Sequence, residues 1–233
     1  MGNASHCRQC ATRHLCLAAD LDGAALDRLS HWMTPGEPLH RGEHLYRAGD
    51  PADGCYIVRS GVFKTVASDA DGGEHVTGFH YPGDLIAMNG QGEGRHLDSA
   101  VALDTSTACR VPLDRLPELW TLGSGQQLLA LLGRAQQHAA EQQTLLARHG
   151  AESRLAGFLV GLARRRERQG LTSDRLPLPM SRTDLANHLG MTLECLSRVL
   201  SRLSRRGVIT AARREVTQNE PEALRAMAQG SSG

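Results

Sequence analysis

Aromatic side chains and long apolar runs are both scarce in this chain of 233 residues. Phe, Trp and Tyr make up 3% of it, so we expect cores built mainly from Leu, Val and Ala. No stretch approaches the roughly 18 apolar residues of a membrane span, and the first ten residues, MGNASHCRQC, contain no apolar signal-peptide core. We therefore expect a cytoplasmic protein without a membrane partner. In that reducing compartment, six cysteines are more typical of metal ligands or buried small residues than of disulfides.

A strong overall charge is also missing, because 26 Lys and Arg nearly balance 25 Asp and Glu. The charge is unevenly distributed, however. Residues 151–233 contain 14 Arg and 8 acidic residues, a net of +6, whereas residues 1–150 contain 12 basic and 17 acidic residues, a net of −5. This division indicates one part that senses or assembles and a basic last third that meets a polyanion.

The first two thirds of the chain change character several times. A short amphipathic helix is predicted over 23–33. From residue 34 to about 113, short apolar runs alternate with Gly- and Asp-rich turns, which is typical of a β-barrel or roll.

A helix of about 25 residues, roughly 37 Å long, is then predicted over 124–148. One stripe of it has heptad spacing: Leu131, Ala135, His138, Gln142 and Leu145. The stripe predicts packing against a partner helix; the alternative is that the helix covers the roll of its own chain.

The last third predicts a winged helix-turn-helix. A helix over 152–168 precedes Ser181 and Asp184, which form a capping-box-like start. Gly190 permits the turn, Thr192 caps a second helix, and residues 208–218 have the pattern of a β-hairpin wing.

The exposed face of the second helix is suited to reading DNA. Arg198 can bond a guanine edge, and Glu194 can accept from a cytosine amino group. Arg182, Arg202, Arg205 and Arg206 suit phosphates, which position the protein without specifying sequence. The alternative is a solvated basic face. The candidate DNA-contacting residues are Arg182, Thr192, Glu194, Ser197, Arg198 and Arg202.

The N-terminus contains the spacing Cys7-x2-Cys10-x5-Cys16. Together with one distant ligand, this run is compatible with an iron–sulfur cluster, with zinc assisted by His6 or His14, or with no metal. We expect Cys55 and Cys195 to be buried small residues.

An enzyme is a weaker interpretation. His40 and His44 have H-x3-H spacing, but they lie in a predicted turn and strand rather than on a helix. Glu43 would point to the opposite side of the strand from His44. We therefore expect no enzymatic activity.

Several stretches together resemble the CRP/FNR family of bacterial transcription regulators, and most closely its oxygen-sensing FNR branch. They are the cysteine run, RAGDPADGCYIVRSGVFK, TGFHYPGDLI, ALDTSTAC, AESRLAGFL and LGMTLECLSR. The resemblance implies an α+β fold with an N-terminal β-roll like that of cyclic-nucleotide-binding domains, a long dimerisation helix and a C-terminal winged helix-turn-helix. The expected segments are 1–22 (cysteine-rich), 23–120 (roll), 121–150 (dimerisation helix) and 151–233 (DNA-binding).

The resemblance also implies a cofactor and a DNA site. By family analogy, Cys7, Cys10, Cys16 and Cys109 hold an oxygen-labile 4Fe–4S cluster, with Leu15 shielding it. Glu194, Ser197 and Arg198 match the residues that read a palindromic TTGAT-N4-ATCAA-like site on double-stranded DNA.

The implied partners are a second copy of the chain and RNA polymerase. The cluster-dependent homodimer would have a seam at Leu131, His138, Glu141 and Leu145. An activator of anaerobic-metabolism genes would meet polymerase through loops near Ser60, Gly73 and Thr105.

The family's cyclic-nucleotide branch is the rival to an oxygen sensor. Its phosphate-gripping Arg-Ser pair is here Asp98-Ser99, a carboxylate that would repel phosphate. Arg95, three residues earlier, is the one candidate substitute.

Overall fold

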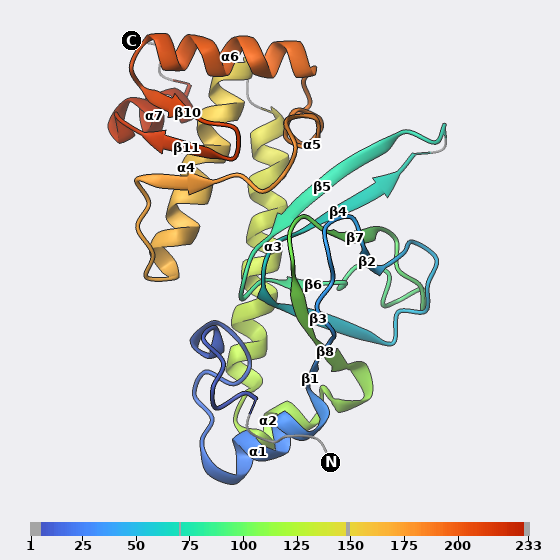
Figure 1. The fold of residues 1–233 in the computed structure, drawn as a ribbon. Helices are drawn as coiled ribbons and strands as arrows, with labels where there is room; N and C mark the ends of the chain where they lie inside the picture. Colours follow the sequence, from blue (N-terminus) through green and yellow to red (C-terminus); the bar gives the residue numbers. More distant parts are fainter. Residues whose placement is uncertain (1–5, 70, 148–149, 231–233) are drawn as a thin grey trace. The chain divides into compact units, whose positions relative to one another are not determined.

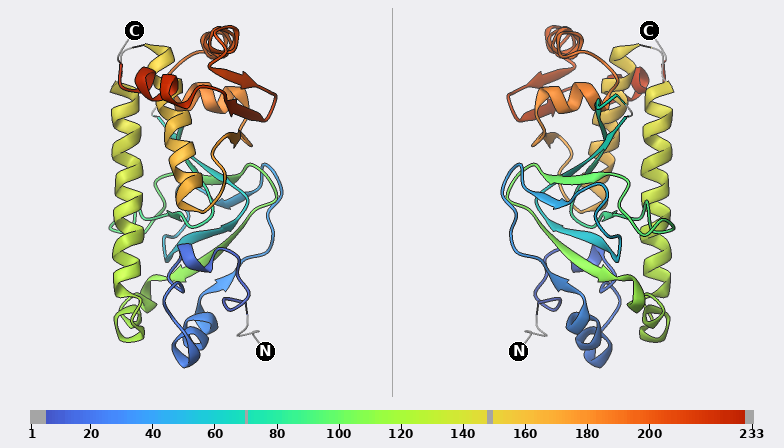
Figure 2. Two further views of the ribbon diagram at one scale, coloured as in Figure 1. Left: turned by 90° about the vertical axis from the view of Figure 1, so that its left-hand side faces the viewer. Right: turned by 90° about the vertical axis from the view of Figure 1, so that its right-hand side faces the viewer.

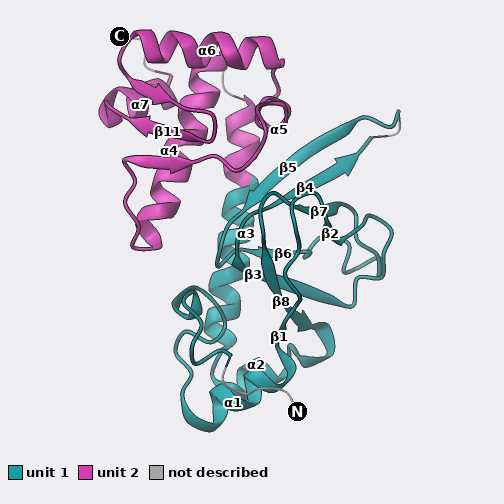
Figure 3. Ribbon diagram, in the orientation of Figure 1, with its two compact units in different colours: residues 1–139 teal, residues 140–233 magenta. Residues whose placement is uncertain are grey.

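The computed structural model describes residues 6–69, 71–147 and 150–230. They form two compact units, residues 1–139 and 140–233 (Figure 3). The predicted cysteine-rich segment and roll both belong to the first unit. The dividing point lies inside helix α3 (Gly125–Ala147), which was predicted over 124–148.

The first unit contains two four-stranded antiparallel sheets, which confirms the predicted roll (Figure 1). One sheet has the order β1-β8-β3-β6 and the other β2-β7-β4-β5. Short helices precede and follow the strands. The strands are β1 (Thr34–Pro35), β2 (His44–Tyr46), β3 (Gly54–Ser60), β4 (Phe63–Ser68), β5 (Glu74–His80), β6 (Leu85–Ile86), β7 (Ser99–Ala102) and β8 (Thr107–Pro112). The helices are η1 (Arg13–Leu15), α1 (Gly23–Trp32), η2 (Leu113–Arg115) and α2 (Glu118–Leu122).

The β3–β8 pair buries both of its faces, because successive strand residues point to opposite sides. Val58 and Ala108 lie in an apolar cluster inside the roll. Their neighbours Ile57 and Cys109, which are paired across the two strands, lie in a second cluster with the N-terminal segment, α1 and the start of α3. The outer face of this sheet therefore holds the N-terminal segment in place.

The second unit is the predicted winged helix-turn-helix. A three-stranded antiparallel sheet of order β10-β11-β9 accompanies four helices. The elements are α4 (Ala151–Arg168), β9 (Arg175–Pro177), α5 (Arg182–His188), α6 (Leu193–Arg205), β10 (Ile209–Ala211), β11 (Glu215–Gln218) and α7 (Pro221–Ala228). The predicted 152–168 helix and the hairpin are both confirmed.

Helix α3 turns the predicted seam stripe toward its own chain. Leu131 is 1% exposed and belongs to the core of the first unit, and the first part of α3 runs beside that unit's strands (Figure 2). Leu145 is 6% exposed, and the Gln142 side chain donates to the His188 carbonyl at 2.8 Å. The alternative interpretation, that this stripe covers the chain itself, therefore describes Leu131, Gln142 and Leu145 better than a partner helix does.

The opposite side of α3 is exposed and has its own heptad spacing. We call this the exposed face of α3. All six of its residues are uncharged and solvent-exposed. They are Leu129, Gly133, Gln136, Ala140, Gln143 and Ala147.

The turn between β3 and β4 makes a specific demand on Gly61. Its φ is +71°, and a Cβ there would collide with Ser106 Oγ and lie 2.6 Å from the Thr105 carbonyl oxygen. Gly42 also has a positive φ, +89°, but a Cβ there would meet nothing within 4 Å. An alanine at Gly42 would therefore meet backbone strain alone, whereas an alanine at Gly61 would meet both backbone strain and a steric collision.

We predict that Gly61→Ala lowers the free energy of unfolding by more than Gly42→Ala does. Gly42→Ala should cost about 1 kcal/mol of backbone strain, and Gly61→Ala a further 1–3 kcal/mol or so for the collision. Denaturant unfolding of both variants measures the difference. Equal losses would contradict the described close approach to Ser106.

Candidate functional sites

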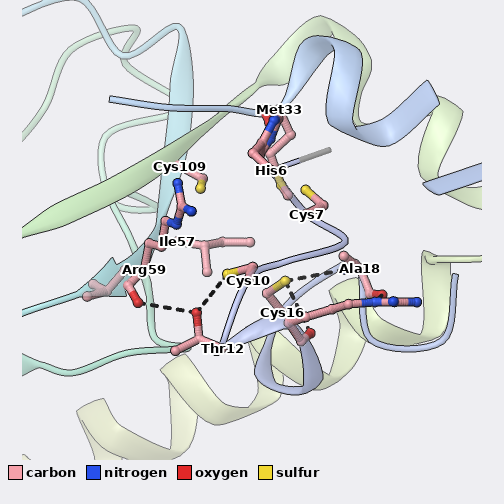
Figure 4. Close-up of a pocket in the computed structure, with 12 residues that line it drawn as sticks. His6, Cys7, Cys10, Thr12, Cys16, Ala18, Met33, Ile57, Arg59 and Cys109 are labelled. Carbon is pink, nitrogen blue, oxygen red and sulfur yellow. Dashed lines mark hydrogen bonds between the residues drawn. The ribbon is translucent and has the colours of Figure 1, made fainter. Parts of the chain in front are cut away.

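The four cysteines of the predicted ligand set line one pocket, which is partly open to solvent. Cys7, Cys10 and Cys16 come from the N-terminal segment and Cys109 from β8 (Figure 4). We call it the cysteine pocket. Its other lining residues are His6, Thr12, Arg13, Ala18, Met33, Ile57, Val58 and Arg59.

Consecutive tight turns bring the three N-terminal thiols together. The amide of Cys10 donates to the Cys7 carbonyl, that of Arg13 to the Cys10 carbonyl, and that of Cys16 to the Arg13 carbonyl, at 3.1–3.3 Å. Because each turn closes over three residues, the x2 and x5 spacings return the sulfurs to one side. Cys109 reaches the pocket from the outer face of β8.

Burial governs the protonation of these thiols. It raises the pKa of Cys16 to about 11 and that of Cys109 to about 12, and it also raises the pKa of Cys7. The neighbouring cysteines add to each rise, whereas Arg59 lowers the pKa of Cys7 and Cys109. Ligation therefore has to displace a proton from these buried thiols.

The histidines considered as zinc ligands have other positions. His6 lines the cysteine pocket, but its Nε2 donates to the Met33 carbonyl at 2.8 Å. His14 is exposed. Within residues 6–69, 71–147 and 150–230, no three His, Cys, Asp or Glu side chains are arranged to hold a single ion.

Cys55, Cys195 and Leu15 do not line the cysteine pocket. Cys55 is fully buried in the β3–β8 sheet, as predicted. Cys195, also predicted to be buried, is only half-buried, because it lies in the first turn of α6. Leu15 packs on the turn at Gly83, where an added Cβ would lie 2.6 Å from Leu15 Cβ. Leu15 thus fastens the cysteine segment to the roll.

Inside the roll, the position of the cyclic-phosphate pair is filled by internal contacts. Buried Asp98 accepts hydrogen bonds from Tyr46 Oη at 3.1 Å and Asn89 Nδ2 at 2.8 Å. Burial raises the pKa of this carboxyl. Ser99 Oγ accepts from the Ala48 amide, and Arg95 donates to the Gly49 carbonyl at 2.7 Å. Both side chains of this candidate pair are thus engaged with backbone groups of the turn at 47–49.

Side-chain caps fix the starts of both helices of the helix-turn-helix. Ser181 Oγ accepts from the Asp184 amide, and the Asp184 carboxylate accepts from the Ser181 amide, which completes the predicted capping box. Thr192 Oγ1 accepts from the Cys195 amide at 3.2 Å and caps α6. The inward face of α6 is buried at Leu196, Val199, Leu200 and Leu203.

Three predicted base-reading residues share the outer face of α6. Glu194, Ser197 and Arg198 are exposed. Hydrogen bonds from its own backbone amide and from the Thr192 hydroxyl lower the pKa of Glu194, which keeps this carboxylate ionised as an acceptor.

Three of the arginines predicted to contact phosphates have protein partners in this structure. Arg202 Nη1 lies 2.7 Å from Glu152 Oε1, and Arg206 lies 3.6 Å from the other carboxylate oxygen. Arg182 Nη2 donates to the Ala212 carbonyl at 2.6 Å and so ties the start of α5 to the wing. The sequence alone did not indicate Glu152, because this contact depends on how α4 meets α6.

A β-roll of the kind found in regulatory domains and a winged helix-turn-helix, joined through one long helix, together define a DNA-binding transcription regulator. Comparisons with known proteins agree. Residues 37–121 match the cyclic nucleotide-binding domain, and residues 153–227 match the Crp-like helix-turn-helix domain.

Similar proteins cover nearly the whole chain. The transcriptional activator protein Anr of Pseudomonas protegens is 37% identical over 98% of this chain and 95% of its own. The fumarate and nitrate reduction regulatory protein of Escherichia coli is 34% identical over 97% and 92%. The solved structure of FixK2 from Bradyrhizobium japonicum has a TM-score of 0.72 and 27% identity, and covers 84% of this chain and 96% of its own.

The chain therefore belongs to the CRP/FNR family, as a transcription regulator of the FNR type. Its relatives are regulators and not enzymes, which agrees with the sequence-based expectation. Among the described helices, none is long and apolar enough to cross a membrane.

We predict that Glu152→Gln strengthens DNA binding by releasing Arg202 and Arg206 from their shared counter-charge. Each arginine that newly meets a phosphate should steepen the log–log dependence of affinity on salt by about 0.9. Fluorescence anisotropy with a short labelled duplex at several salt concentrations measures this slope.

Glu222→Gln is the matched control, because Glu222 pairs with Arg225 on α7 and its removal changes the net charge equally. If both variants gain the same affinity and slope, Glu152 acts only through overall charge and the specific prediction is wrong.

Proposed function

We propose that this chain is an oxygen-responsive transcription activator in which Cys7, Cys10, Cys16 and Cys109 bind a 4Fe–4S cluster. The observation that carries the proposal is the meeting of these four thiols, three from the N-terminal segment and one from β8, in one pocket. When bound, such a cluster supplies oxygen-sensitive redox chemistry.

The donor set fits this group. Thiolates are soft ligands, and four of them are what a 4Fe–4S cluster takes. The cluster offers four separate iron corners, so its ligands can be distributed around a pocket. A single zinc ion instead requires every sulfur within about 2.3 Å of one point.

Charge in the pocket supports the same assignment. Four thiolates gathered in a buried space repel one another. Arg59 lines the pocket and favours the charged form of Cys7 and Cys109. A bound cationic centre would complete this compensation.

The cysteine segment contacts the start of α3 directly, which supplies a route from the pocket to the long helix. Ser124 Oγ donates to the Leu17 carbonyl at 2.9 Å, and Arg134 Nη2 donates to the Leu15 carbonyl at 3.4 Å. Gln127 also donates to Asp20. Losing order in residues 7–21 would remove these contacts from the first turns of α3.

We infer that the exposed face of α3 pairs with a second copy to give the homodimer. This revises the seam predicted from the sequence, since Leu131 and Leu145 are already covered by their own chain. Small residues such as Gly133 and Ala140 permit two helices to approach closely. Glu141 is exposed beside this face, and like charges facing each other across a two-fold axis would weaken the pairing.

A two-fold dimer would present two α6 helices to a palindrome, about one DNA turn apart. Glu194, Ser197 and Arg198 would read TTGAT-N4-ATCAA-like half-sites. RNA polymerase would be met by roll loops near Ser60 and Thr105, which are exposed, and near Gly73, whose backbone amide donates to the Asp69 carboxylate at 2.7 Å.

We predict that protein purified without oxygen is brown, contains about four iron atoms per chain and bleaches in air. Cys109→Ser should lose the iron, whereas Cys55→Ser should retain it, because Cys55 is buried in the same sheet but does not line the pocket. Iron analysis and visible absorption measure both. A colourless wild-type protein with one zinc per chain would overturn the proposal.

We predict that Ala140→Glu keeps the anaerobic protein monomeric, because it places like charges on the exposed face of α3. Ala226→Glu, at an exposed position on α7, is the control and should still dimerise. Leu131→Ala should instead lower the free energy of unfolding by about 2–5 kcal/mol. Sedimentation and denaturant unfolding distinguish these outcomes, and a dimeric Ala140→Glu protein would contradict the revised seam.

A further inference from the structure

Thr12 lies between a candidate ligand and the roll. Its Oγ1 is 3.2 Å from Cys10 Sγ and donates a hydrogen bond to the backbone carbonyl of Arg59, also at 3.2 Å. Both contacts are drawn in Figure 4, where the threonine joins the cysteine segment to β3. Thr12 is half-buried at the start of η1 and lines the cysteine pocket.

The Thr12 hydroxyl cannot donate to the Arg59 carbonyl and to Cys10 at the same time. A threonine hydroxyl has one hydrogen and two acceptor lone pairs. While that hydrogen points to the Arg59 carbonyl, the contact with Cys10 requires the thiol to donate to Oγ1. A ligated Cys10 is a thiolate with no hydrogen, so the contact can persist only if the hydroxyl donates to sulfur.

We propose that Thr12 is a positioning residue for Cys10, and that its hydroxyl donates to the Cys10 thiolate when the cluster is bound. This inference rests on the proposed function and extends it to a residue that is not itself a ligand. Hydroxyl rotation is sufficient for the exchange, because Oγ1 already lies at hydrogen-bond distance from both partners.

The hydrogen bond has a defined electronic consequence. Hydrogen bonds to the ligating sulfurs are among the features that set the reduction potential of iron–sulfur clusters. A donor to sulfur stabilises the more electron-rich state, so its loss should shift the potential to more negative values and speed oxidation in air. Cys16 has a comparable donor in the backbone, since the Ala18 amide lies 3.4 Å from Cys16 Sγ.

The test compares Thr12→Val, which removes the hydroxyl but keeps the shape, with Thr12→Ser, which restores it. Thr121→Val is the matched control, because exposed Thr121 donates to the Glu118 carbonyl within α2 and does not line the pocket. Three properties are measured on the full chain: iron retention against a chelator without oxygen, the reduction potential, and the rate of bleaching in air. The unfolding midpoint of the metal-free protein is recorded in parallel.

Thr12→Val should lose iron to the chelator about tenfold more readily, bleach faster, and have a more negative potential. Thr12→Ser and Thr121→Val should stay near the wild type. If Thr12→Val lowers only the stability of the metal-free protein, with potential and bleaching unchanged, Thr12 is merely a tether to Arg59 and the inference is wrong. An iron-free wild-type protein would overturn the proposed function and this inference together.

Discussion

Apolar packing of the N-terminal segment against the outer face of the β3–β8 pair is the interaction on which the cysteine pocket depends. It holds Ile57 and Cys109 against the cysteines and leucines of the N-terminal segment in one buried cluster. That arrangement places thiols in surroundings where burial disfavours the thiolate. The same side chains that fasten the segment to the roll are therefore those that a soft metal centre would use. Anything bound between the sulfurs must also change how firmly the segment is held.

The exposed face of α6 that carries Glu194, Ser197 and Arg198 is positioned by interactions between residues close in the sequence. The capping box at Ser181 and the Thr192 cap set the two helices, and α6 buries its apolar stripe. Glu194, Ser197 and Arg198 are then exposed on one face without any contribution from the first unit. Because this face forms within its own unit, regulation is most simply exerted through whether two copies are presented together.

Much of this was predictable from the sequence, and the failures have a common cause. Periodicity and turns predicted α4, the helix-turn-helix and α3 closely, and spacing singled out Cys7, Cys10 and Cys16. The orientation of α3 was not predictable, because Leu, Ala and Gln occur on both of its sides and a 4-3 repeat fits either. The contacts of Arg182 and Arg202 were missed because their partners, Ala212 and Glu152, are brought near only by tertiary packing.

Strand alternation explains how one roll can serve two kinds of sensor. Ala108 faces the interior, where family members of the cyclic-nucleotide branch would hold their ligand, and Cys109 faces outward. In this chain the buried carboxylate of Asp98 is bonded by Tyr46 and Asn89. A phosphate would meet a carboxylate there instead of a guanidinium. Under the proposed function, the group that responds to a signal would be Cys109, on the other face of the same strand and in one cluster with the segment that contacts α3.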